Sequence, residues 1–221
     1  MNLNTYLLQT YKNGFFVDVG ANDGIKDNKT LILENNNWSG ICIEGLKLNY
    51  DKLIKNRKCI CCYEVVDFCD NREIDFVEQT SDIYSNTFGG SFILNYDNNE
   101  EGYKDYQQEL DSALNFLTSK LGGKKVKRIT KSLNTILKEQ NCPNIIHYLK
   151  LDIERLEYQV MKTFDFNLYT PYFILAEGQV GYMDNNKLVT LLLNNNYHIA
   201  NNDSQNILFQ HNSIYQNGII I

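Results

Sequence analysis

The sequence lacks most features that mark secreted, membrane-spanning or nucleic-acid-binding proteins. It has no apolar stretch long enough to span a bilayer, and its start has no basic segment followed by an apolar run. Positive charge is not in excess, because the formal net charge is −6, whereas phosphate backbones are bound by clustered Lys and Arg. We therefore expect a cytoplasmic protein whose partners are neither nucleic acids nor membranes.

The chain also lacks the paired motifs of a zinc finger, although it has six cysteines. Cys59, Cys61 and Cys62 form a Cys-x-Cys-Cys group with Cys69 nearby, but no second Cys-x-x-Cys or His pair follows. A reducing compartment disfavours disulfides. Thiols that alternate in a buried strand are the interpretation that we favour, and a zinc site is the alternative.

Apolar runs typical of buried strands alternate with amphipathic segments, which predicts an α/β fold. The expected strands are 15–19, 40–44, 58–66, 74–77, 124–129, 145–151, 172–176, 197–200 and 206–210, and the expected helices are 3–12, 30–36, 46–56, 133–138, 154–163 and 184–193. This order favours a Rossmann-like, mostly parallel sheet with helices on both faces and ligands at the carboxyl ends of its strands. No linker divides residues 1–221, so we expect a single domain.

A glycine turn follows the first expected strand, in the sequence F-V-D-V-G-A-N-D-G at 16–24. Gly20 permits a tight turn close to a ligand, and Gly24 lets the chain turn toward the next helix. Asn22 stands where a dinucleotide-binding turn has its second glycine, which disfavours a dehydrogenase. Asp18, two positions before Gly20, suits a ligand with a positively charged head, such as S-adenosylmethionine, and Asn22 and Asp23 add polar contacts. An ordinary polar loop is the alternative.

Acidic residues follow the next two expected strands. Glu44 ends G-I-C-I-E about twenty residues after the glycine turn, where nucleotide-binding folds place an acid that binds the ribose hydroxyls. Asp67 is a weaker candidate for a contact with the adenine amino group, because aspartate is common in turns.

Three more carboxylates follow two later strands: Asp152 and Glu154 after 145–151, and Glu177 after 172–176. Such acids can remove a hydroxyl proton, or hold a divalent cation that assists its removal. Asp152 and Glu177 are the candidate pair for a cation such as Mg²⁺. The alternative is that these residues are solvated strand ends, with Glu154 favouring the start of a helix.

Three segments together resemble the FkbM family of methyltransferases: F-V-D-V-G-A-N-D-G, W-S-G-I-C-I-E-G, and H-Y-L-K-L-D-I-E-R-L-E-Y-Q-V-M-K-T-F-D-F. The resemblance implies a seven-stranded class I methyltransferase fold, S-adenosylmethionine as donor, and O-methylation, often of sugars in glycans. It implies that the methionine part of the cofactor is lined by Asp18, Gly20, Asn22, Asp23 and Gly24, assisted by Asn28 and Thr30. Glu44 would hold the ribose, and Asp152 and Glu154 would lie beside the transferred methyl group.

The chain departs from the family pattern at two places. Arg155 stands where the family has glycine after D-I-E, which would narrow or recharge the entrance for the acceptor, and Gly45-Leu46 stands where a Pro-rich segment is typical. The abundance of asparagine and the compact size are similar to those of viral homologues. A viral protein of this kind would be located in the host cytoplasm.

Residues 79–123 interrupt the alternation of strands and helices, and we interpret them as an acceptor platform and lid. The candidate sugar-binding residues there are Asp82, Tyr84, Asn86 and Phe88. The expected partner is thus a sugar or glycan acceptor. Methylation of RNA or protein, and a non-catalytic nucleotide-binding protein, remain alternatives, and the oligomeric state is open.

Overall fold

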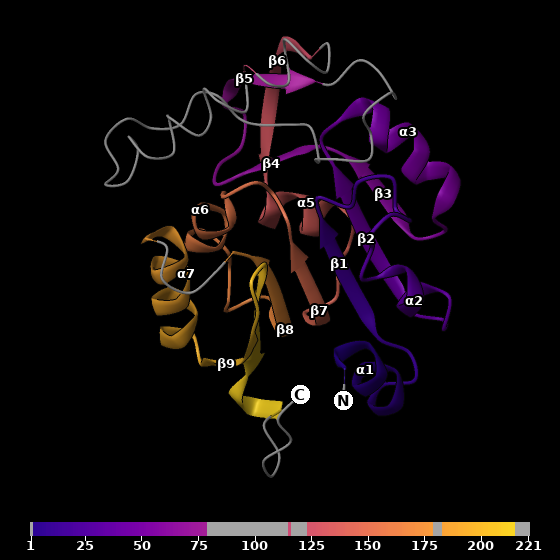
Figure 1. Cartoon of the computed structure of the whole chain (residues 1–221), viewed down its shortest axis with the longest axis vertical. Helices are drawn as coiled ribbons and strands as arrows, with labels where there is room; N and C mark the ends of the chain where they lie inside the picture. The colour runs from indigo at the N-terminus through magenta and orange to yellow at the C-terminus, as the bar shows by residue number, and fades with distance from the viewer. Residues whose placement is uncertain (1, 79–114, 116–122, 179–182, 215–221) are drawn as a thin grey trace.

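A seven-stranded sheet forms the centre of the protein. The computed structural model describes residues 2–78, 115, 123–178 and 183–214 (Figure 1). The strand order is β3-β2-β1-β7-β8-β10-β9, and every neighbouring pair is parallel except those that β10 makes with β8 and β9. The strands are β1 (Phe15–Val19), β2 (Ser39–Glu44), β3 (Ile60–Tyr63), β7 (Ile145–Leu151), β8 (Thr170–Glu177), β9 (Tyr197–Asn202) and β10 (Asn206–His211). The expected mostly parallel sheet is confirmed.

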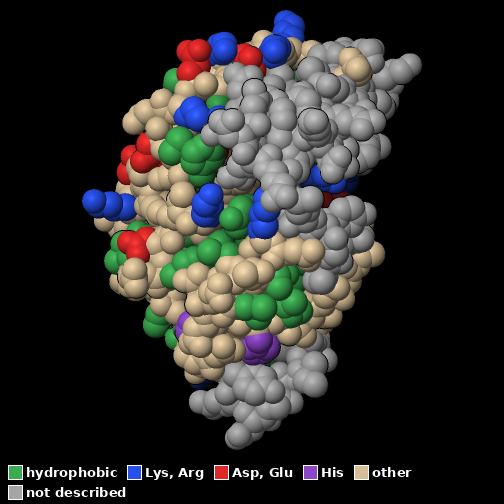
Figure 2. Space-filling model, turned by 90° about the vertical axis from the view of Figure 1, so that its left-hand side faces the viewer, with side chains coloured by type: hydrophobic (Ala, Val, Ile, Leu, Met, Phe, Trp, Pro, Cys, Tyr) green, Lys and Arg blue, Asp and Glu red, His purple; other side chains and the backbone are tan. Residues whose placement is uncertain are grey.

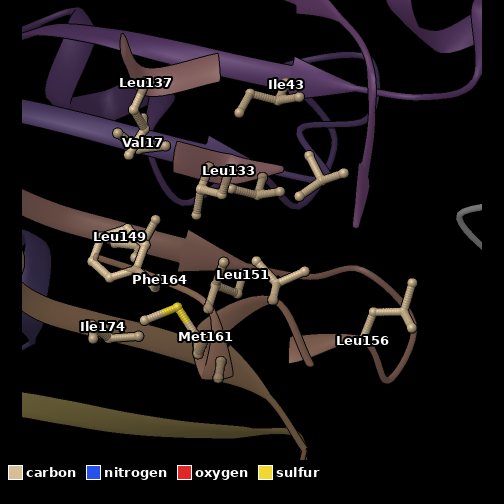
Figure 3. Packing of buried hydrophobic residues seen from close by; sticks show 14 of the residues in the cluster. Val17, Ile43, Leu133, Leu137, Leu149, Leu151, Leu156, Met161, Phe164 and Ile174 are labelled. Atoms are coloured by element: carbon tan, nitrogen blue, oxygen red, sulfur yellow. The ribbon is translucent and has the colours of Figure 1, made fainter. Parts of the chain in front are cut away.

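Helices cover both faces of this sheet, because alternate residues of each central strand are apolar on opposite sides. The helices are α1 (Leu3–Thr10), α2 (Leu31–Glu34), α3 (Lys47–Asn56), α5 (Leu133–Glu139), α6 (Glu157–Lys162) and α7 (Met183–Asn194), with a short 3-10 helix η2 (Asn212–Ile214). Phe16 and Tyr148 pack on the side of α1, α2 and α3. Their neighbours Val17 and Leu149 pack on the side of α5 and α6, and Figure 3 shows them in one apolar cluster with Leu137 and Met161.

A second, three-stranded sheet was not expected from the sequence. It has the order β4-β6-β5 and is made of β4 (Val65–Asp67), β5 (Glu73–Glu78) and β6 (Lys124–Ser132). The prediction of one strand over 58–66 was therefore wrong, because β3 and β4 belong to different sheets. Cys62, Val65 and Val66 all pack in the same apolar core, so the sequence has the pattern of a single buried strand. Glu64 marks the break, and its carboxylate pairs with Lys131 of β6 at 2.7 Å.

The outer part of this small sheet is held by charge pairs across its strands. Lys127 Nζ lies 2.8 Å from Asp75 Oδ1, and Lys125 Nζ lies 3.5 Å from Asp75 Oδ2. Figure 2 shows basic and acidic side chains close together at the top of the molecule, where Figure 1 places β5 and β6. The basic residues of β6 are thus largely balanced by acidic residues of β5.

The other elements lie within a few residues of their expected positions, with one informative difference. The helix expected over 154–163 begins only at Glu157. Glu154 and Arg155 have φ angles of 56° and 76°, which are left-handed and cannot continue a right-handed helix. The two residues instead form a turn between β7 and α6.

The described structure also bears on the membrane and cysteine predictions. No helix in the described ranges is long and apolar enough to cross a membrane. All six cysteines are free, and Cys61 and Cys62 of β3 pack on opposite faces of the sheet. The prediction of alternating strand thiols is confirmed.

Candidate functional site

The predicted cofactor and catalytic residues other than Asp67 lie where the carboxyl ends of β1, β2, β7 and β8 come together. The strand order runs in opposite directions from β1, toward β2 on one side and toward β7 on the other. Ligands in open α/β sheets bind at such a point. The register places Asp18 of β1 directly between Cys42 of β2 and Lys150 of β7.

The glycine turn after β1 is held tightly between two neighbouring segments. The Gly20 amide donates to the Ile43 carbonyl at 3.0 Å. Gly20 has a φ of 77°, and a Cβ atom there would lie 1.8 Å from the carbonyl oxygen of Asp152. Only glycine fits this position without a shift of the backbone. The glycine turn and the segment after β7 are therefore in direct contact.

Asp18 lies beneath this turn with no exposed surface. Its Oδ2 accepts hydrogen bonds from Asn28 Nδ2 at 2.9 Å and Thr30 Oγ1 at 2.7 Å, and its Oδ1 faces Lys150 Nζ at 3.3 Å. The predicted residues Asn28 and Thr30 are thus brought to Asp18, which they hold in place. A direct contact between Asp18 and a ligand would require one of these partners to move.

Arg57, just after α3, supports the same turn and was not singled out from the sequence. Its guanidinium donates to Asn28 Oδ1 at 3.1 Å, Thr30 Oγ1 at 3.0 Å and the Gly24 carbonyl at 3.3 Å. It also pairs with Glu34 of α2. An arginine within the polar run K-N-R-K carries no pattern that separates it from surface residues, so no sequence signal points to it.

The remaining residues of the turn have mixed roles. The amide of Asn22, which has a φ of 53°, donates to Glu44 Oε2 at 2.8 Å. Asp23 Oδ1 accepts from the Ile25 and Lys26 amides, both at 2.9 Å. A Cβ at Gly24, where φ is 79°, would lie 2.7 Å from side-chain atoms of α3 and Arg57. Asp23 and Gly24 therefore shape the turn and seat it on α3.

Glu44, the predicted ribose ligand, is buried at the end of β2. Its two oxygens accept from the backbone amides of Asn22 and Leu46 at 2.8 and 2.7 Å. Burial raises the pKa of Glu44 to about 7, against these hydrogen bonds. The carboxyl thus stands beside the glycine turn, as predicted.

Asp67, the predicted adenine contact, is fully buried at the end of β4 in the small sheet. Its Oδ1 accepts from the Phe68 amide at 2.8 Å, and its Oδ2 accepts from Arg72 Nε at 2.7 Å. These contacts give Asp67 a structural role, and its contact with adenine stays a prediction.

Four carboxyl groups gather after β7 and β8: those of Asp152, Glu154, Glu177 and Glu157, of which Glu157 was not predicted. Burial and the charges of Glu177 and Asp152 raise the pKa of Glu154 to about 8. Burial likewise raises the pKa of Glu157 to about 8, while its Oε1 accepts from the Ile153 amide at 2.9 Å. A carboxyl at the first residue of α6 reads in the sequence as a helix-start residue, which hid its proximity to the others.

Asp152 and Glu177 directly follow the paired residues Leu151 and Ala176, so they lie at neighbouring ends of β7 and β8. Partial burial, the charge of Asp152 and a hydrogen bond between the two carboxyl groups raise the pKa of Glu177 to about 7, although this residue is exposed at the strand end. The side chain of Asp152 is 43% exposed. The site therefore holds acids that exchange protons near neutral pH, where general bases work best.

The predicted metal pair does not extend to a full ligand set within the described ranges, where no group of three or more His, Cys, Asp or Glu is arranged to hold an ion. The cysteines of these ranges form no such group either, which gives no support to a zinc site. Lys150 Nζ lies 3.1 Å from Asp152 Oδ2, so an ammonium group already faces this carboxylate.

The predicted acceptor-binding residues are mostly beyond what the structure describes. Asp82, Tyr84, Asn86 and Phe88 lie outside the described residues. Arg155 is described, and its positive charge acts to lower the pKa values of both Glu154 and Glu177. The expectation that Arg155 narrows or recharges the entrance for the acceptor stays a prediction.

The sheet with one antiparallel strand, the glycine turn after β1 and the acid after β2 together define a Rossmann-like methyltransferase fold. The family model of the methyltransferase FkbM domain matches residues 18–199, a range that includes every described candidate residue from Asp18 to Glu177. The chain belongs to the FkbM methyltransferase family. No curated protein gives a significant match to the chain.

Proposed function

We propose that the chain is an S-adenosylmethionine-dependent O-methyltransferase whose acceptor is a sugar hydroxyl of a glycan or glycoconjugate. The observation that carries this proposal is the position of Asp152 and Glu177 at neighbouring strand ends, with the Asp152 amide bonded to the Val19 carbonyl just before the glycine turn. The donor fits the charge of the site, because the carboxyl groups of Asp18, Glu44 and Asp152 outnumber the ammonium of Lys150. When bound, S-adenosylmethionine supplies an electrophilic methyl group.

Two tasks remain for the protein in such a reaction. The first is to hold donor and acceptor in line at a short distance, which falls to the glycine turn and to Glu44. The second is to accept the proton of a poorly acidic hydroxyl, since the acceptor oxygen forms a bond to the methyl carbon while the bond from carbon to sulfur breaks. In this proposal the carboxylates of Asp152, Glu154 and Glu177 serve this second task.

Binding should be measured first, by calorimetric titration of S-adenosylmethionine, S-adenosylhomocysteine and NAD, with Mg²⁺ and with a chelator. We expect the first two to bind and Glu44→Gln to weaken both by about tenfold or more, the loss of a charge-assisted hydrogen bond. Glu139→Gln, on the far surface of α5, is the matched control. Binding of NAD alone, or of none of the three, would contradict the proposal.

The acceptor is then identified by transfer of a labelled methyl group to free sugars, glycans, RNA and peptides. Transfer to a sugar hydroxyl, lost in Asp152→Asn, supports the proposal, and transfer to RNA or peptide alone refutes its acceptor class. Binding without any transfer would favour a non-catalytic nucleotide-binding protein. Activity that disappears with the chelator and returns with Mg²⁺ would establish a cation that the described residues do not by themselves indicate.

A further inference from the structure

Lys150 is a buried lysine inside the site. The roles proposed for the glycine turn and for the acids give it no function. It lies in β7, two residues before Asp152, and its side chain is 9% exposed. Its ammonium nitrogen lies 3.3 Å from Asp18 Oδ1, 3.1 Å from Asp152 Oδ2 and 3.3 Å from the Gly20 carbonyl oxygen. A buried cation is costly unless it is paired, and Lys150 has two carboxylates and a carbonyl as partners.

The partners of Lys150 come from both halves of the site. Asp18 and Gly20 belong to the cofactor turn, whereas Asp152 belongs to the acidic group after β7. The backbone already joins these halves, since the Asp152 amide donates to the Val19 carbonyl at 3.0 Å. Lys150 adds the only side-chain link between Asp18 and Asp152 that the described residues show.

The bond from Lys150 restrains the orientation of Asp152. Its side chain is 43% exposed and would otherwise sample several rotamers at the strand end. Asp18 depends on Lys150 for a counter-charge, because Asp18 Oδ1 accepts no hydrogen bond of good geometry from the described residues. The positive charge of Lys150 also acts on the carboxyl groups of Glu44 and Glu177.

We propose that Lys150 is a positioning residue for methyl transfer: its ammonium holds the Asp152 carboxylate at a fixed place relative to the cofactor turn. This inference rests on the proposed function, because Asp152 needs a defined position only if it acts on an acceptor beside the cofactor. A lysine that served folding alone would influence stability but not the division between binding and turnover.

Lys150→Met keeps the length of the side chain and removes its charge. We expect kcat to fall by about 100-fold, the usual effect of a misplaced reacting group, while the Kd for S-adenosylhomocysteine rises by less than tenfold. Lys150→Arg should recover at least tenfold of the lost kcat. Lys131→Met is the matched control, because Lys131 also bridges two carboxylates, Glu64 and Glu139, at 2.7 and 2.9 Å but in the small sheet. Its kcat should stay within twofold of the wild type.

A second pair of variants keeps the test decisive if Lys150→Met does not fold. Asp18→Asn removes the buried negative charge that Lys150→Met would leave without a counter-charge, and retains the bond from Lys150 to Asp152. We expect the double variant Asp18→Asn with Lys150→Met to have a kcat at least tenfold below that of Asp18→Asn alone. Values within threefold of each other would overturn the positioning role.

The two proposals fail in different ways. A wild-type chain that neither binds S-adenosylhomocysteine nor methylates an acceptor shows that the proposed function is wrong, and the role of Lys150 falls with it. An active wild type with an equally active Lys150→Met variant overturns the role of Lys150 alone.

Discussion

At the scale of single residues, Gly20 is the position where the structure has the least room for a side chain. Gly20→Ala would place a methyl group 1.8 Å from the Asp152 carbonyl oxygen, at a φ of 77°. We expect a loss of about 3 kcal/mol or more in the free energy of unfolding, from the sum of left-handed strain and overpacking. Chemical denaturation measures it. Gly45→Ala is the control, because the nearest atom to its Cβ would be 3.2 Å away, and an equal loss in both variants would contradict the argument.

Arg155 shows the opposite case, a large residue in a conformation that suits glycine. Its φ of 76° explains why the family pattern has glycine here. We expect Arg155→Gly to stabilise the protein by about 1 kcal/mol, the relief of left-handed strain. The measurement belongs near pH 6, where the acids that Arg155 faces are largely protonated, so the loss of its charge has little effect.

The control for this prediction is a glycine at a position with ordinary helical geometry. Lys138→Gly in the last turn of α5 should destabilise by up to about 1 kcal/mol, the usual difference in helix propensity. If Arg155→Gly destabilises the protein as much as Lys138→Gly does, backbone strain at Arg155 is not significant.

At the scale of elements, the start of α6 makes the stability of the protein dependent on pH. Burial raises the pKa of Glu157 to about 8, well above its unfolded value, so the folded state holds the proton more tightly. The resulting stability is fully present below about pH 4.5 and is lost as the pH rises through 8. The raised pKa values of Glu44, Glu154 and Glu177 act in the same direction. We therefore expect the free energy of unfolding to fall as the pH rises from 5.5 to 8.

Glu157→Gln tests this slope and keeps an oxygen that can accept from the Ile153 amide. Urea denaturation from pH 5.5 to 8 should show a slope reduced by up to about 1.4 kcal/mol per pH unit, the value for one proton. An unchanged slope would mean that Glu157 does not titrate in this window. Below this range the trend reverses, because hydrogen bonds from Arg57, Lys58 and Cys59 outweigh burial and lower the pKa of Glu34, whose contribution is lost on acidification.

The elements that sequence patterns predicted well are those whose burial is decided within the segment. β1 and β7 match their expected ranges because each is an apolar run bounded by turn residues. The division of 58–66 into β3 and β4 could not be predicted, since it depends on which partner strand is nearby, and β4 pairs with β6 some sixty residues later. The same reason explains why Arg57 was missed, and why Lys150 was missed although Asp152 is close in sequence: Asp18 and Gly20, its other partners, come from a distant segment.

At the scale of the whole molecule, the mostly parallel pairing of the strands and the edge that carries the site were predicted from the alternation of elements. The acids after β1, β2, β7 and β8 were predicted to meet, and the parallel pairing brings their strand ends together. The small sheet was not predicted, and it attaches beside the site through Arg128 of β6, which donates to the Gly45 carbonyl at 2.8 Å and to Tyr63 Oη at 2.6 Å. Strands were expected at 74–77 and 124–129, but their residue patterns do not indicate that they pair with each other and with β4 in a separate sheet.

The two sheets differ in how they are buried, and this difference predicts the order in which they open. β1 and β7 lie at the centre of the large sheet with nearly every residue buried, whereas β6 exposes four of its first six residues: Lys124, Lys125, Lys127 and Ile129. Segments with few buried apolar contacts open locally below the free energy of global unfolding. We expect amides of β5 and β6 to exchange with deuterium at least tenfold faster than those of β1 and β7, a difference of about 1.4 kcal/mol. Mass-spectrometric exchange at neutral pH measures this directly. Equal protection in both sheets would instead mean that the contacts of Arg128 join them into one cooperative unit.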